Sequence, residues 1–138
     1  MNDKLFAYPN GECLVTREYP DVNFVLDLIH SAKGIAVMAH PVMFNNTELL
    51  LELIEAGKLD GIEAYHHSAT PTQQQKLADI AKEHDLIVTG GSDFHGLYNE
   101  TMTHIGSMTT DKENLDKLFK LIHINSQKAN KAAVKTEK

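Results

Sequence analysis

Several features are scarce in this 138-residue chain, and each absence excludes a class of protein. The chain has one cysteine, Cys13, so it has no internal disulfide framework, and a reducing cytoplasm fits this composition. Arginine occurs once, at Arg17, and the formal net charge is −6, so we expect no extended nucleic-acid-binding face. No apolar run approaches the length of a membrane span, so we expect no membrane association, and the N-terminus lacks a signal-peptide core.

The residues that are present suit one domain, because 42% of the chain is hydrophobic. Residues 1–20 show no clear period, and we expect an irregular segment or a short strand there. Residues 21–125 carry regular patterns and form the predicted domain. Residues 126–138 are polar and rich in lysine, which predicts a tail that is frayed or continues a helix.

Helical and strand-like patterns alternate along this domain. Apolar residues at helical spacing predict helices over about residues 21–33, 46–56 and 71–84. Short, mainly apolar runs predict strands at residues 35–39, 61–65 and 86–88, and the first is apolar throughout. Ile35, Ile62 and Ile87 lie 27 and 25 residues apart, which is typical of consecutive strand–helix units. The sequence therefore predicts an α/β fold with a parallel sheet and flanking helices.

Further along the chain, residues 105–108 are apolar enough to predict one more short strand. Thr110 and Glu113 have the spacing of a capping box, which predicts a helix start there. An amphipathic pattern follows up to about residue 125.

Right-handed crossovers would place the carboxyl ends of the three predicted strands at one edge of the sheet. The residues that follow those ends are rich in ligand chemistry: His40, His66, His67, Asp93 and His95. Ligand sites in α/β folds form at this edge. The sequence therefore predicts a binding site there.

Asp93 and His95 stand in the string Gly90-Gly91-Ser92-Asp93-Phe94-His95-Gly96. Residues two apart in extended backbone point the same way, so a carboxylate and an imidazole can reach one divalent metal. His40 ends another predicted strand, because Pro41 follows it, and is a third candidate ligand. The plainer interpretation is a capped turn at Asp93 with solvated histidines.

Other residues keep two interpretations. His66 and His67 face opposite ways if their strand continues, so that one contacts substrate and the other solvent. Glu63 lies mid-strand and either supports the site or forms hydrogen bonds in the core. Four further histidines are expected to be structural or solvated: His30, His84, His104 and His123.

Three strings, at residues 36–41, 60–66 and 89–96, closely resemble the C-terminal half of the polymerase and histidinol phosphatase (PHP) superfamily. The resemblance covers roughly residues 21–108. It points to the bacterial metal-dependent phosphoesterases, which include nucleoside 3',5'-bisphosphate phosphatases with RNA-trimming activity. The resemblance implies a distorted (β/α)7 barrel and a hydrolase with two or three divalent metal ions, commonly manganese, iron or zinc.

By this resemblance His40, Asp93 and His95 are metal ligands and catalytic residues, and His66 contacts the substrate phosphate. The implied substrate is a nucleotide or a short RNA. The His-Pro motif departs from many relatives, because Val42 and Met43 stand where those have glycine and a basic residue.

The His-x-His motif that opens the family, with the further ligands of its first strands, is not present in this chain. We therefore expect a truncated, C-terminal portion of a PHP phosphoesterase, whose exposed sheet edges pair with a missing N-terminal half or a second copy. The sequence leaves open whether this chain is itself an enzyme. The alternative is a catalytically silent α/β module that acts in assembly or partner binding. Another metallohydrolase, such as an amidohydrolase, fits the glycine-rich string less well.

Overall fold

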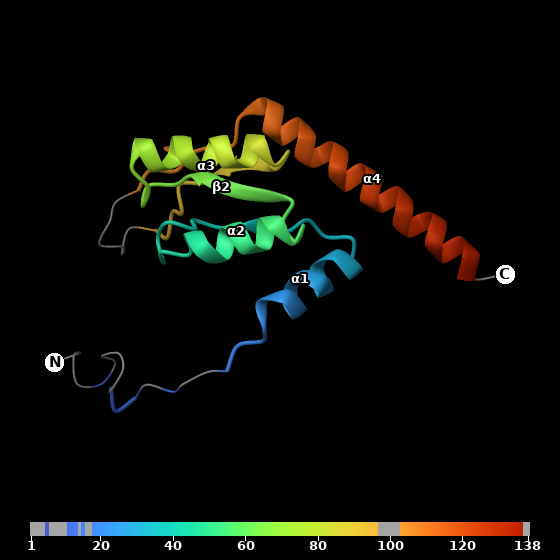
Figure 1. The fold of residues 1–138 in the computed structure, drawn as a ribbon, viewed down its shortest axis with the longest axis horizontal. Helices are drawn as coiled ribbons and strands as arrows, with labels where there is room; N and C mark the ends of the chain where they lie inside the picture. Colours follow the sequence, from blue (N-terminus) through green and yellow to red (C-terminus); the bar gives the residue numbers. More distant parts are fainter. Residues whose placement is uncertain (1–4, 6–10, 14, 16–17, 97–102, 137–138) are drawn as a thin grey trace.

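The computed structural model describes Leu5 and residues 11–13, 15, 18–96 and 103–136. Within these residues the elements, in chain order, are α1 (Val22–Ser31), β1 (Val37–Met38), α2 (Thr47–Glu55), β2 (Gly61–Tyr65), α3 (Pro71–Glu83), β3 (Ile87–Gly90) and α4 (Lys112–Thr136) (Figure 1). None of the helices in this part of the chain combines the length and the apolar character that crossing a bilayer requires.

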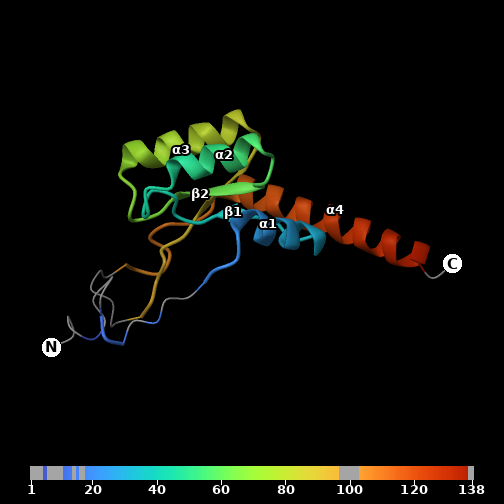
Figure 2. The same ribbon diagram turned by 60° about the horizontal axis from the view of Figure 1, so that its bottom comes forward.

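The three strands form one parallel sheet in the order β1-β2-β3. Val37 lies opposite Gly61 in the first pair, and Gly61 lies opposite Ile87 in the second. Helices α2 and α3 connect successive strands and lie side by side on one side of the sheet (Figure 2). The predicted α/β fold is therefore confirmed, and all three strands end at the same edge.

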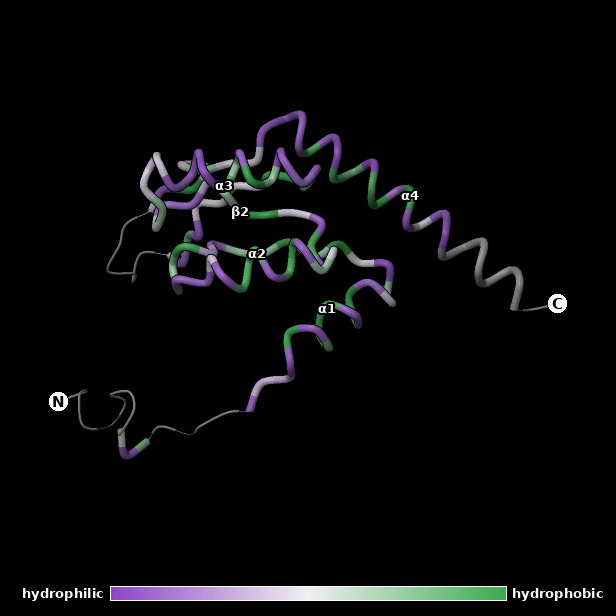
Figure 3. The backbone as a smooth tube through the Cα atoms, in the orientation of Figure 1, coloured by the Kyte–Doolittle hydropathy of each residue, from purple (hydrophilic) through white to green (hydrophobic). Residues whose placement is uncertain are grey.

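The core lies between β2 and the helices that cover it. Ile62 and Ala64 of β2 are fully buried, and they pack with Leu50 of α2 and with Leu77 and Ala81 of α3. Apolar and polar residues alternate along α2 and α3, so each helix turns one face to the sheet (Figure 3). This packing holds the strands rigidly, and burial of each large apolar side chain contributes about 1.5–3 kcal/mol.

Local sequence signals fix most helix boundaries. The Asp21 carboxylate caps α1, accepting hydrogen bonds from the backbone of Asn23 and Phe24. Thr70 and Gln73 form a complete capping box at the start of α3. After α1 the left-handed residue is Lys33, with φ of 62°. Gly34, which follows it, allows close packing, because a Cβ there would lie 2.9 Å from Ile29 Cγ2.

Some predicted elements need correction. The first strand is shorter than expected, since regular pairing covers Val37–Met38 alone. Residues 105–108 form turns and bends, and among the described residues after β3 the pairing is an isolated antiparallel bridge between Gly91 and Thr109. The Thr110 hydroxyl accepts a hydrogen bond from the Gly90 N–H, so the Asp111 carboxylate caps α4 in its place.

Helix α4 continues through residue 126, so the first part of the predicted polar tail is helical (Figure 1). Most of the segment predicted at residues 1–20 lies outside the described residues. The domain boundaries that the sequence suggested stay predictions.

Candidate metal centre

The loops that follow the three strands bring imidazole and carboxylate groups together. His40 comes shortly after β1, His66 directly after β2, and Asp93 shortly after β3. The ring centroids of His40 and His66 lie 5.0 Å apart. His66 Nε2 lies 3.5 Å from Asp93 Oδ2. His66 therefore stands between the other two residues at the edge that the sequence predicted.

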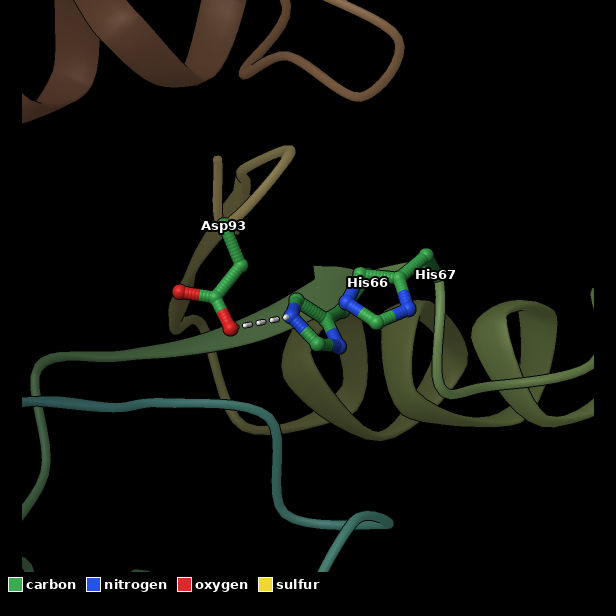
Figure 4. Close-up of side chains that lie close together, drawn as sticks. All are labelled: His66, His67 and Asp93. Atoms are coloured by element: carbon green, nitrogen blue, oxygen red, sulfur yellow. Dashed lines mark ion pairs between the residues drawn. The ribbon is translucent and has the colours of Figure 1, made fainter. Parts of the chain in front are cut away.

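Among the described residues, His66, His67 and Asp93 form a group whose nearest ligand atoms all lie within 4.8 Å of one another (Figure 4). The rings of His66 and His67 are 4.2 Å apart between centroids. The expectation that these two histidines face opposite ways required the strand to continue. Strand β2 ends at Tyr65, so the alternation of side chains stops before His66. The sequence carried a signal for this in the turn-forming Ser68 that follows.

Two buried ring nitrogens in this region have no hydrogen-bond partner among the described residues: His40 Nδ1 and His66 Nε2. His66 is only 1% exposed. Buried polar atoms are nearly always paired, so these two nitrogens mark an edge that a bound ligand, or a small shift of the Asp93 carboxylate, would complete. Imidazole and carboxylate donors suit zinc, iron or manganese. The residues present therefore fit the divalent metal that the motifs implied.

Two of the predicted ligands, Asp93 and His95, differ in the exposure of their side chains. The Asp93 side chain is 34% exposed and that of His95 is 63% exposed. His95 Nδ1 lies 2.7 Å from the Asp93 carbonyl oxygen and 3.6 Å from Asp93 Oδ1. In the described part of the chain, His40 and His95 are not in the tight group that contains Asp93. The ligand set of His40, Asp93 and His95 and the phosphate contact of His66 therefore stay predictions.

His40 and Asp93 also share an unusual backbone conformation, with φ of 30° and 48°. Few residues other than glycine adopt positive φ, although aspartate and histidine tolerate it better than most. Such strain persists where the surroundings enforce it, and it collects at functional sites. Positive φ also occurs at Lys33, Asn45 and Asp85, so this conformation in His40 and Asp93 agrees with a site at this edge but does not identify one.

Glu63 connects two of these loops. Its Oε2 accepts a hydrogen bond from the backbone N–H of His40 over 2.9 Å. A Cβ at Gly91 would lie 2.8 Å from Glu63 Oε1, so a glycine there leaves room for the carboxylate. Of the two interpretations that the sequence left open, the structure supports the one in which Glu63 holds the site together.

The chain is similar to several known proteins. No protein-family model matches the chain. It is 34% identical over 96 residues to a phosphoribosyl 1,2-cyclic phosphate 1,2-diphosphodiesterase from Eggerthella lenta, a match that covers 70% of this chain and 36% of the relative. It is 40% identical over 96 residues to a 5'-3' exoribonuclease from Haemophilus influenzae, a match that covers 67% of this chain and 35% of that protein.

A crystal structure from Bifidobacterium adolescentis, of a protein described as a metal-dependent phosphoesterase, superimposes with a TM-score of 0.68 and 30% identity. That match covers 83% of this chain and 41% of the solved chain. The chain thus spans about a third of the length of the curated relatives it matches. These likenesses confirm what the motifs predicted: the chain is related to the metal-dependent phosphoesterases of PHP type and corresponds to one part of them.

Proposed function

We propose that this chain forms part of a phosphoesterase site that hydrolyses phosphate esters of nucleotides or short oligonucleotides. The observation that carries the proposal is the gathering of His40, His66 and Asp93 where three parallel strands end, with His40 Nδ1 buried and without a partner in the described part of the chain. The relatives act on phosphodiester substrates according to their names, and the solved relative is described as metal-dependent.

His40, Asp93 and His95 are the proposed metal ligands. Manganese is the ion we expect, with iron or zinc as the alternatives. A bound ion would supply an activated water for attack on phosphorus and would neutralise negative charge. The protein's own contribution is to hold two imidazoles and a carboxylate at one edge and to fix their orientation. The phosphate contact of His66 stays a prediction of the sequence and is not part of this proposal.

The test is hydrolysis of a nucleoside 3',5'-bisphosphate by the 138-residue chain with manganese. We expect measurable turnover, and we expect His40→Ala and Asp93→Ala to lower it by about 100-fold or more, because the metal contributes several kcal/mol. His84→Ala is the matched control, because His84 lies exposed at the end of α3. Turnover that survives both site variants would overturn the proposal.

A second candidate is a catalytically silent α/β module that acts in assembly or partner binding. The match spans about a third of each curated relative, so turnover by these 138 residues by themselves is what the assay must decide. Metal binding without turnover on the bisphosphate would favour this second function over the first.

A further inference from the structure

The two histidines that flank Asp93 receive different hydrogen bonds, and these assign their tautomers. The backbone N–H of Ser68 donates to His66 Nδ1 over 3.2 Å, and the Ser68 hydroxyl lies 2.8 Å from the same nitrogen. A backbone N–H can only donate, so Nδ1 must carry a lone pair. The proton of the neutral ring is therefore on Nε2, the atom that faces Asp93.

His95 has the opposite arrangement. Its Nδ1 lies 2.7 Å from the carbonyl oxygen of Asp93, and a carbonyl can only accept. The proton is therefore on Nδ1, and Nε2 keeps its lone pair. Metal-binding histidines commonly donate one ring N–H to a carbonyl or carboxylate and bind the ion through the other nitrogen. The hydrogen bonds thus leave His95 Nε2 with a lone pair that can bind a metal ion. His66 Nε2 carries a proton and lacks the lone pair that a metal ligand needs.

We infer that Ser68 fixes His66 as an N–H donor that orients the Asp93 carboxylate, so that His66 is a positioning residue and not a metal ligand. The inference rests on the proposed metal site. The distance of 3.5 Å from His66 Nε2 to Asp93 Oδ2 is longer than a formed hydrogen bond, so the inference requires this distance to shorten when the site is loaded. Hydrogen bonds of this kind are often long in the free protein and shorten when the site is loaded.

The distances between ligand atoms would by themselves place His66 in a metal site with His67 and Asp93. The tautomer assigned to His66 argues against that placement. The assignment also argues against a direct contact between His66 and the substrate phosphate. His66 Nε2 is buried, and Asp93 is the polar group it faces, so a phosphate would reach it only after Asp93 moved.

The direct test is long-range proton–nitrogen NMR of the ¹⁵N-labelled chain at mildly alkaline pH, where neutral imidazoles show which nitrogen is protonated. We expect Nε2–H for His66 and Nδ1–H for His95. His30 is an internal reference, because its Nε2 lies 3.0 Å from the Asp60 carboxylate and must be protonated there. A His66 ring protonated at Nδ1 would overturn the inference.

Addition of Zn²⁺, which is diamagnetic, separates this inference from the proposed function. We expect the His95 Nε2 signal to shift on binding and the His66 Nε2 proton to remain. Loss of that proton on zinc binding would make His66 a ligand and overturn the inference while the metal site stands. An unchanged spectrum at saturating zinc would overturn the proposed metal site, while the free-protein spectrum still decides the tautomers.

Variants test the role of each group. His66→Gln can place an amide N–H near the position of Nε2, whereas His66→Asn cannot reach it. We expect Asn to weaken zinc binding about 10- to 100-fold, as loss of a group that supports a ligand does, and Gln to restore most of it. Ser68→Ala keeps the backbone N–H, so the His66 tautomer should persist. Equal affinities for the two His66 variants, or a changed tautomer in Ser68→Ala, would contradict the assigned roles.

Discussion

The backbone N–H of His40 donates a hydrogen bond to Oε2 of Glu63 over 2.9 Å, which joins the loop after β1 to the middle of β2. His40 needs this support because its φ of 30° is unfavourable for a residue with a side chain. Glu63 therefore acts on the site through the backbone of a proposed ligand. The following predictions concern this contact, the proposed metal ligands and the helix that follows the site.

Glu63→Ala should weaken metal binding by about 10- to 100-fold, because the loop that carries His40 loses its hydrogen-bond acceptor. Glu63→Gln keeps an amide oxygen in the same place and should retain most of the affinity. Calorimetric titration with zinc measures both. Glu83→Ala, an exposed change at the end of α3, is the control. Wild-type affinity in Glu63→Ala would show that the contact does not serve the site.

Gly91→Ala should destabilise the chain by about 1–2 kcal/mol, because the new Cβ would lie 2.8 Å from Glu63 Oε1. Combining it with Glu63→Ala removes the clash, so the double variant should be more stable than the sum of the two changes predicts. Urea unfolding of wild type, Gly91→Ala, Glu63→Ala and the double variant measures this coupling free energy.

Gly90→Ala is the control for this comparison of single and double variants. A Cβ at Gly90 would lie 2.7 Å from the Thr109 carbonyl oxygen and 2.9 Å from Tyr65 Cβ, neither of which Glu63→Ala removes. Its effect on stability should therefore add to that of Glu63→Ala. Additive effects at Gly91 as well would contradict the proposed steric contact.

Metal ions should raise the thermal stability of the chain, because an ion that binds the folded state alone stabilises it. At 100 times the dissociation constant the gain is about 2.7 kcal/mol. We expect Asp93→Asn and His95→Ala to lose this gain, a chelator to reverse it, and His84→Ala to keep it. A thermal shift of normal size in Asp93→Asn would exclude Asp93 as a ligand.

Asp111→Ala should destabilise the chain by about 1 kcal/mol near neutral pH, since the Asp111 carboxylate accepts hydrogen bonds from the backbone and side chain of Asn114 at the start of α4. The Asn114 backbone hydrogen bond, followed by the Asn114 side-chain hydrogen bond, lowers the pKa of Asp111 below its usual 3.8. A lowered pKa in the folded state means that this stabilisation is present above pH 3.8 and disappears as the pH falls through the folded value.

Unfolding of wild type and Asp111→Ala across the acid range checks this, and their difference should shrink below pH 3.8. Asp111→Asn caps a helix about as well and should remove the pH dependence while keeping the stability. Asp116→Ala, which breaks an exposed pair with Lys112, should change stability by less than about 1 kcal/mol. A constant difference between wild type and Asp111→Ala down to low pH would contradict the assignment.

The sequence by itself determined the order of helices and strands, the parallel sheet and the edge at which the proposed site lies. Apolar periodicity and regular spacing carry this information, because a βα unit has one favoured handedness. The strand at 61–65 was correct to the residue, since Gly61 and the turn after Tyr65 bound it. The predicted strand at 105–108 was wrong, because a short apolar run without a pairing partner does not form a strand.

Only the tertiary structure decided what each polar group at that edge contacts. Glu63 meets the His40 backbone across two strands, and no local pattern encodes a contact between residues 23 positions apart. The nearness of His67 to His66 and Asp93 depends on the turn after β2, and the tautomers of His66 and His95 depend on single backbone groups at Ser68 and Asp93. Sequence patterns specify which faces are buried, whereas hydrogen-bond partners follow from the positions of atoms that only the folded chain brings together.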